Sequence, residues 1–106
     1  MATSSSLRFD YEVESGDTTF VKCHGNVIWK AADDLKQLIE PMIPKCRRIV
    51  LDFSDVNHMD SSGLGTLVGL KLSAGGAAHC SLEFINFSPH IKEQLHITKL
   101  SQLLGS

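Results

Sequence analysis

One run of residues near the middle of the chain restricts the fold more than any other feature. Residues 48–53, with the sequence RIVLDF, form a continuous segment rich in apolar and β-branched side chains. Such a segment is typical of a central strand that is covered on both faces. A short polar loop follows it, and then apolar residues recur with helical spacing among several glycines. The sequence thus predicts a strand that leads directly into a helix, as in α/β folds.

The N-terminal part predicts two further strands. Apolar residues alternate from Leu7 to Val13, and β-branched and aromatic residues are dense from Thr18 to His24. Between them, the sequence ESGD at residues 14–17 has the composition of a turn. We therefore expect an antiparallel hairpin, which Gly25 ends.

The first helix is predicted over residues 29–43, where the hydrophobic period changes to three and four residues. Pro41 lies inside this pattern and Pro44 follows it, so the helix is expected to end or bend near Glu40. Its predicted buried residues are Ala32, Leu35, Leu38, Ile39 and Met42.

The second helix is predicted from Ser61 or Ser62 to about Ala74. It ends at the glycine pair Gly75–Gly76. Its predicted buried residues are Leu64, Leu67, Val68 and Leu72.

The C-terminal part predicts one more strand and two helices. The sequence SLEFINF from Ser81 to Phe87 has the composition of a strand. Ser88 is a typical N-cap with a proline after it, which predicts a helix through Leu95. A last short helix is expected from Ile97 to Leu104. The predicted order is therefore β-β-α-β-α-β-α with this extra helix, and it implies a mixed four-stranded sheet.

The length of 106 residues is that of one domain with one core. Residues 1–6 are small and polar, so we expect them to be disordered and residues 7–104 to form the single domain. The net charge of -2 does not suit a nucleic-acid-binding protein, because phosphate contacts require concentrated basic residues. The basic residues around Arg47 are too few to form a binding stripe.

The cysteines and the hydropathy indicate where the protein acts. Cys23, Cys46 and Cys80 are widely spaced and form no C-x-x-C motif, so neither a disulfide framework nor a zinc site is indicated. The N-terminus lacks the apolar segment of a signal peptide. No run approaches the roughly 18 apolar residues of a membrane span. We therefore expect a cytoplasmic protein without membrane insertion, with its thiols buried or half-buried.

Two adjacent serines at the predicted start of the second helix raise the question of catalysis. A nucleophilic serine on a strand-to-helix turn normally has glycines two residues before and two residues after it. Gly63 follows Ser61 at this distance, but Met59 precedes it. Half of the motif is missing, and no spacing places a histidine as its base. We therefore predict that the protein is not an enzyme.

The glycines of the same segment raise the question of a bound nucleotide. Gly63, Gly65 and Gly69 follow a strand and open a helix, but their spacing is one residue too long for a dinucleotide fingerprint. No glycine-rich loop precedes them. A small-ligand or nucleotide-binding module is therefore the weaker alternative, and we expect no cofactor.

A third interpretation is that Ser61 accepts a phosphoryl group. Gly65 and Gly69 each cost a helix roughly 1 kcal/mol relative to alanine, and they lie on the same face as Ser61, one and two turns further on. A phosphoryl group there would meet free N–H groups and the positive end of the helix dipole. Its negative charge would be unfavourable next to Asp60, a like charge, and next to any partner docked along the glycines. Two structural alternatives remain: Asp60 or Ser61 acts only as the N-cap, and the glycines allow close packing of the helix on the sheet.

The segment VLDFSDVNHMDSSGLGTLV and the weaker motif HGNV resemble the STAS domain family over nearly the whole chain, from about Leu7 to Leu104. The resemblance is closest to the small stand-alone bacterial anti-sigma factor antagonists. It implies the α/β fold predicted above and a partner-switching cycle. In that cycle the unphosphorylated protein binds a GHKL-type serine kinase that is also an anti-sigma factor. The kinase phosphorylates the antagonist and releases it, and a metal-dependent serine phosphatase reverses the modification.

The resemblance also implies which residues take part. Carried over by motif, Ser61 is the phosphorylated residue. The residues implied as its surroundings are Asp60, Ser62, Gly63, Leu64 and Gly65, and Gly25, Asn26 and Val27 are implied as further partner contacts. Gly69 is predicted as a partner contact because it lies on the same helix face as Ser61. The chain departs from the family where antagonists often have an acidic residue, because Ile28 and Trp29 stand there. Trp29 is either an exposed partner contact or a residue packed at the start of the first helix.

An alternative within the family is a STAS subunit of another complex, in which Ser61 stays unmodified. A stress-signalling assembly and a lipid-transport accessory are two examples.

Overall fold

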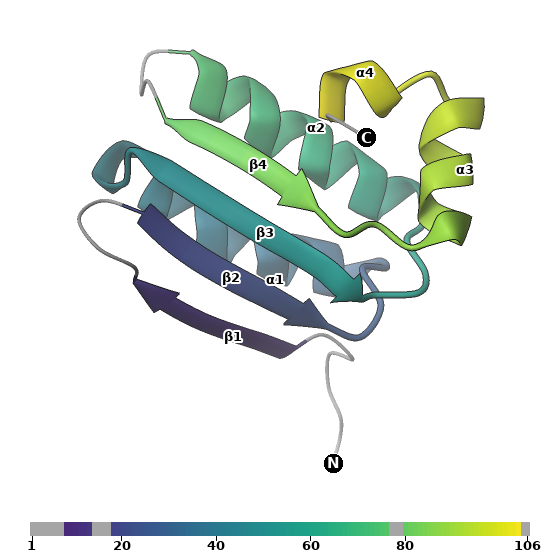
Figure 1. Ribbon diagram of the computed structural model, residues 1–106, viewed down its shortest axis with the longest axis horizontal. Helices are drawn as coiled ribbons and strands as arrows, with labels where there is room; N and C mark the ends of the chain where they lie inside the picture. Colours follow the sequence, from purple (N-terminus) through teal and green to yellow (C-terminus); the bar gives the residue numbers. More distant parts are fainter. Residues whose placement is uncertain (1–7, 14–17, 77–79, 105–106) are drawn as a thin grey trace.

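The four predicted strands form one mixed sheet. The structure, a computed structural model, describes residues 8–13, 18–76 and 80–104. The strands lie in the order β1-β2-β3-β4 (Figure 1). β1 pairs antiparallel with β2, whereas β2 with β3 and β3 with β4 are parallel. Their bounds are Arg8–Val13, Thr18–His24, Arg48–Asp55 and Ser81–Ile85. The predicted mixed α/β sheet is confirmed.

The helices follow the predicted order. They are α1 (Lys30–Ile39), α2 (Ser61–Gly75), α3 (Pro89–Ile97) and α4 (Ser101–Leu104), with a 3₁₀ helix, η1 (Glu40–Lys45), after α1. The change from α1 to η1 at Glu40 confirms the expected break before Pro41, whose missing N–H cannot continue an α-helix.

Two predicted helix boundaries are also confirmed. The Ser88 hydroxyl accepts a hydrogen bond from the Ile91 N–H at 3.3 Å, and Pro89 follows in the first turn of α3. α2 ends at the glycine pair, with Gly76 as its C-cap.

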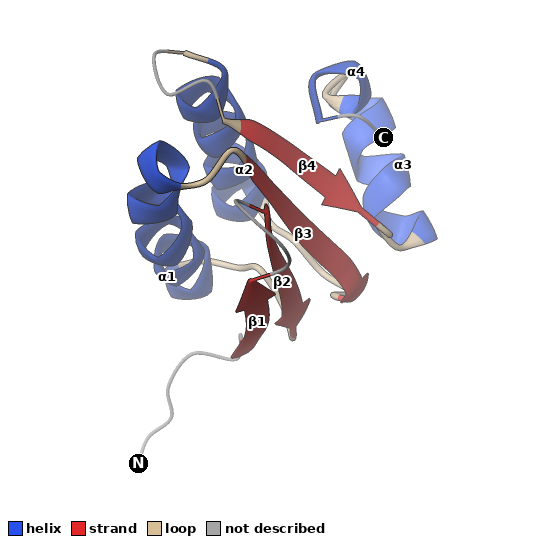
Figure 2. Ribbon diagram, turned by 60° about the vertical axis from the view of Figure 1, so that its left-hand side comes forward, coloured by secondary structure: helices blue, strands red, loops and turns tan. Residues whose placement is uncertain are grey.

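The core lies between one face of the sheet and the helices. α1 and α2 cover this face, and α3 and α4 lie beyond the β4 edge (Figures 1 and 2). Phe53 from β3 stacks on Phe87 with ring centroids 5.1 Å apart. The sheet side of the core consists of Val21, Cys23, Ile49, Leu51, Phe53, Leu82 and Phe84.

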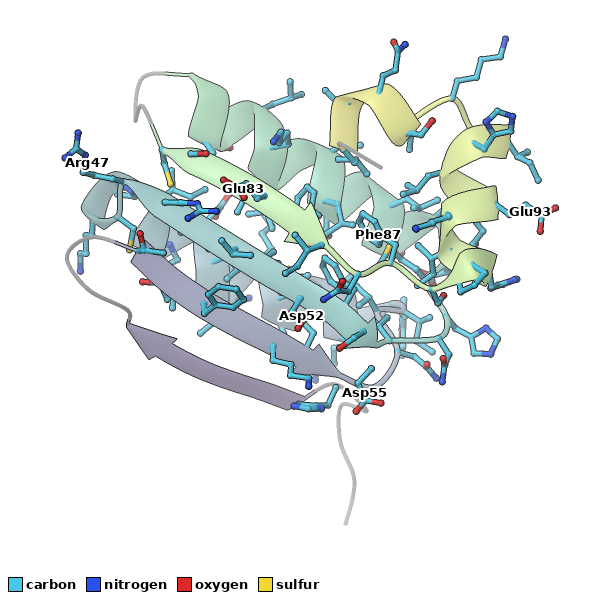
Figure 3. The ribbon with its side chains drawn as sticks, viewed as in Figure 1. Arg47, Asp52, Asp55, Glu83, Phe87 and Glu93 are labelled. Carbon is cyan, nitrogen blue, oxygen red and sulfur yellow. The ribbon has the colours of Figure 1, made fainter. Side chains whose placement is uncertain are left out.

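The prediction that β3 is covered on both faces is wrong. The helices of the described residues pack on one face, and the other face carries Asp52 and Glu83 (Figure 3). Glu83 forms an ion pair there with Arg48. Val50 also lies on this second face, yet it is only 2% exposed. It lies between Phe20 and Glu83 in the register of the sheet. The run is continuously apolar because neighbours in the sheet, not a second layer of helices, bury Val50.

The ion pair on the open face should make stability depend slightly on acid pH. The hydrogen bond from the Arg48 guanidinium lowers the pKa of Glu83. A lowered folded-state pKa contributes stability above the unfolded pKa of about 4.3, and this stability is lost as the pH falls through the folded value. Glu83→Gln should therefore unfold at lower urea than wild type at pH 7, by less than about 1 kcal/mol because the pair is half exposed. The difference should shrink as the pH falls below about 4.3, because Glu83 loses its charge as the pH falls through its folded-state pKa; a difference that did not change with pH would contradict this origin.

The predicted burial of Leu72 is wrong, since its side chain is 63% exposed. Leu70 and Ala74 are buried instead, together with the predicted Leu64 and Leu67. α2 is apolar on most of its circumference, so spacing alone did not distinguish its buried side. In α1 and η1, the predicted Leu38 and Met42 are only half-buried.

The three cysteines are free thiols, Cys23 and Cys80 buried and Cys46 half-buried, as expected. Burial raises the pKa of Cys23 to about 12. None of the helices in the described part is both long and apolar enough to cross a membrane. The predicted turn at residues 14–17 and the predicted disorder of residues 1–6 fall outside the described residues.

Candidate functional site

Two loops meet at the carboxyl end of the sheet. One joins β2 to α1 and the other joins β3 to α2, and both lie beyond the arrowheads of the two strands (Figure 1). They are side by side because parallel neighbouring strands end at the same edge. The Val27 N–H donates to the His58 carbonyl at 3.0 Å, and Val27 forms a parallel bridge with Met59. The Gly25 N–H donates to the Asp55 carbonyl at 3.1 Å.

Asp60 joins both loops to the start of α2. Its Oδ1 accepts a hydrogen bond from the Gly63 N–H at 3.0 Å, which caps the helix. Its Oδ2 accepts a hydrogen bond from the Trp29 N–H at 3.1 Å. Of the two N-cap candidates in the sequence, Asp60 is therefore the cap. Ser61 is the first residue of the helix and is free of that role.

Ser61 and Ser62 are both exposed on the first turn of α2. Within the described residues, neither hydroxyl has a hydrogen-bond partner, and no base is in contact with either of them. His58 and His90 pack edge to face, with ring centroids 5.5 Å apart, in a contact of their own. The hydroxyls are therefore accessible from solvent, but nothing in this part of the chain activates them as nucleophiles.

Gly63 is a position of close approach. A Cβ atom added there would lie 2.5 Å from the Met59 Cγ and even closer to the Val27 carbonyl oxygen. Because contacts this short do not occur, only glycine lets the first turn of α2 pack against both loops.

Gly65 and Gly69 differ from Gly63. Both are exposed, and no atom lies within 4 Å of an added Cβ at either position. The interpretation that the glycines serve close packing of α2 on the sheet is therefore wrong for these two. Together with Ser61 they form a stripe without large side chains along the solvent side of α2.

The glycine stripe borders a groove of about 280 Å³ between α1 and α2. Lys36 and Glu40 line it from the side of α1 and its continuation, and Thr66 and Ser73 line it from α2. The sequence analysis missed these groove residues, since only the packing of α1 beside α2 brings them together. Their polar side chains were the one signal in the sequence.

Trp29 is the N-cap residue of α1 and is 78% exposed. Of the two interpretations, the exposed residue is the correct one. Ile28 beside it is 37% exposed. Asn26 is half-buried in the same loop.

Three residues of the predicted site are buried. Val27 is 0% and Leu64 is 8% exposed, and Gly63 is enclosed by the loops. We therefore expect them to position the exposed residues around Ser61.

A nucleotide-binding site receives no support at this helix end. A phosphate would approach the first N–H groups of α2, but the Asp60 carboxylate already accepts the hydrogen bond of the Gly63 N–H. No cluster of histidine, cysteine, aspartate and glutamate in the described residues has the grouping of a metal site.

A family model described as "Mlab, STAS domain" matches residues 12–105 of the chain. The chain belongs to the STAS family. A STAS-domain containing protein of Pseudomonas aeruginosa is 30% identical over 88 residues, which is 83% of this chain and 86% of that protein.

Several solved structures share the fold. An anti-sigma factor antagonist from Mycobacterium paratuberculosis is 20% identical with a TM-score of 0.80, over 96% of this chain and 86% of that one. The unphosphorylated anti-sigma factor antagonist SpoIIAA is 21% identical with a TM-score of 0.76, over 91% and 84%. The murine anion transporter Slc26a9 also contains the fold, with 12% identity and a TM-score of 0.70, over 92% of this chain and 19% of the transporter.

Proposed function

We propose that this STAS protein is a cytoplasmic anti-sigma factor antagonist that is switched off by phosphorylation of Ser61. The observation that carries the proposal is the exposed Ser61 hydroxyl at the first residue of α2, next to the glycine stripe. Asp60 and not Ser61 supplies the capping side chain, so the Ser61 hydroxyl is available for modification. The fold accepts such a modification in a relative, because Bacillus SpoIIAA has been solved in a phosphorylated form with a TM-score of 0.71 to this chain.

The proposed partner is a GHKL-type serine kinase that is itself an anti-sigma factor. Its docking surface on this chain would be the glycine stripe, the groove between α1 and α2, and Trp29 at the end of α1. An aromatic side chain with this exposure is a typical anchor at protein interfaces. A flat stripe lets a partner helix or loop approach the backbone of α2 closely.

The chemistry would require only an acceptor hydroxyl from this chain. The Ser61 oxygen forms a bond to the γ-phosphorus of ATP while the bond from that phosphorus to the leaving ADP breaks. A base of the kinase takes the hydroxyl proton. A metal-dependent phosphatase reverses the state when water cleaves the phosphoester and releases phosphate. The chain is then a substrate, and no catalytic base is assigned to it.

Incubation with ATP and the kinase should add one phosphoryl group to the wild type. Ser61→Ala should remain unmodified, whereas Ser62→Ala should be modified at the wild-type rate within about twofold, since neither serine is the N-cap. Intact-mass spectrometry with peptide mapping measures both. If Ser61→Ala were still modified, or if only Ser62→Ala lost the modification, Ser61 would not be the phosphorylated residue.

A second candidate is a STAS subunit of another complex that works without phosphorylation. The occurrence of the same fold in a sulfate transporter family protein from Wolinella succinogenes (TM-score 0.74) and in Slc26a9 favours it. In that case Ser61 would be only the first residue of α2, and its replacement by aspartate would leave partner binding unchanged.

A further inference from the structure

Trp29 has a backbone conformation that a bulky residue rarely adopts. Its φ is 47° and its ψ is -116°. The carbonyl of Ile28 accepts a hydrogen bond from the Ala31 N–H at 2.9 Å, which closes a four-residue turn around Trp29. These angles are those of the first central residue of a type II′ turn, a position that glycine usually occupies. Any side chain there is strained, and one as large as tryptophan is an outlier.

Packing does not explain the tryptophan. Its side chain is 78% exposed, so little of it contributes to the core. A glycine would fit the same backbone without strain. A strained conformation persists only where the surrounding structure enforces it, and such residues cluster at functional sites.

One carboxylate contacts this turn from the neighbouring loop. Asp60 Oδ2 accepts the Trp29 N–H at 3.1 Å, while Oδ1 accepts the Gly63 N–H at 3.0 Å. The Asp60 N–H in turn donates to the Val27 carbonyl at 3.4 Å. Asp60 directly precedes Ser61, and its carboxylate thus joins the exposed tryptophan to the first turn of α2.

We propose that Asp60 is a positioning residue that holds Trp29 in its strained, outward conformation, and that a phosphoryl group on Ser61 releases it. The second half, the release of Trp29 by phosphorylation, rests on the proposed function. A phosphoryl group beside Asp60 repels the carboxylate and competes with it for the N–H groups of the first turn of α2. The displaced carboxylate no longer accepts the Trp29 N–H. The strained turn then relaxes, and the partner loses its aromatic anchor together with the uncharged serine.

The first half is tested on the isolated protein with Asp60→Ser. A serine oxygen still caps α2 at the Gly63 N–H, but it has no second oxygen for Trp29. Amide hydrogen exchange by NMR should be at least tenfold faster at Trp29 in Asp60→Ser than in wild type, and Asp60→Asn serves as a second variant of native shape. Asp55→Ser is the matched control, because its carboxylate bonds to His24 instead. Unchanged exchange at Trp29 in both Asp60 variants would overturn the proposal.

The second half is tested with Ser61→Glu and with the phosphorylated protein. Faster Trp29 exchange together with loss of the kinase partner supports release. Loss of the partner with wild-type exchange at Trp29 overturns release and leaves the proposed function in place. Partner binding that survives in both forms overturns the proposed function, while the Asp60→Ser result still decides the first half. Trp29 is the one tryptophan of the chain, so its near-ultraviolet circular dichroism gives a second readout.

Discussion

Gly63→Ala should destabilise the protein by about 3 kcal/mol, the cost of inserting a methyl group where no space exists. For a domain of this size that corresponds to roughly 15 °C in melting temperature. The added Cβ would lie 2.5 Å from the Met59 Cγ and closer still to the Val27 carbonyl oxygen. The Met59 side chain can rotate away, but the Val27 backbone is held by its bridge to the β3–α2 loop. Relief therefore requires the two loops to separate from α2.

Gly65→Ala and Gly69→Ala are the matched controls on the same helix. No atom lies within 4 Å of either added Cβ, so each should raise stability by up to about 1 kcal/mol through helix propensity. Thermal and urea unfolding of the three variants measure the contrast. If Gly63→Ala were as stable as Gly65→Ala, the close contact between α2 and the Val27 loop would be wrong.

These glycines show what the sequence could and could not predict. All three follow one strand and begin one helix, and the local spacing does not distinguish them. Only the bridge between Val27 and Met59, a contact between loops about 30 residues apart, makes Gly63 tight and leaves Gly65 and Gly69 open. The boundaries of α2 were predictable, because capping residues and terminal glycines are local signals.

The same distinction explains the errors on β3 and on Trp29. An apolar run predicts a buried strand, but it does not say whether helices or neighbouring strands bury it. Val50 is buried by neighbouring strands. For Trp29 the sequence left exposure and packing equally open. Its turn geometry and its bond to Asp60 depend on the meeting of the two loops. The motif around Ser61 could be recognised because it is continuous in sequence. Lys36 and Glu40 across the groove could not be assigned to the site, because they are distant from Ser61 in sequence.

Ser61→Asp should bind the kinase partner at least 100-fold more weakly than Ser61→Ala. An uncompensated charge enclosed in an interface costs about 2–5 kcal/mol, and the aspartate would stand at the edge of the glycine stripe where the partner docks. Ser61→Ala should bind constitutively, since it removes only an exposed hydroxyl without a partner in the described chain. Titration with the purified kinase measures the affinity of both variants. A pull-down from the native lysate, with wild type, Ser61→Ala and Ser61→Asp as baits, identifies the kinase.

The charge should act on the partner and leave the fold intact. Ser61→Asp lies in the first turn of α2, where a negative charge gains about 0.3–1 kcal/mol from the helix dipole, and this offsets part of the repulsion by Asp60. Its melting temperature should therefore stay close to that of wild type; an unfolded Ser61→Asp would contradict a surface switch.

Ser54→Asp supplies the same change of charge on an exposed residue outside α2 and should bind normally. A bulky residue at Gly65 should mimic Ser61→Asp without any charge, because it fills the stripe while the fold has space for it. Loss of binding in both Ser61→Asp and the Gly65 variant would place the partner on the stripe. Equal recovery of the same partners by wild type, Ser61→Ala and Ser61→Asp would instead make Ser61 a structural residue of α2 and favour a STAS subunit that acts without phosphorylation.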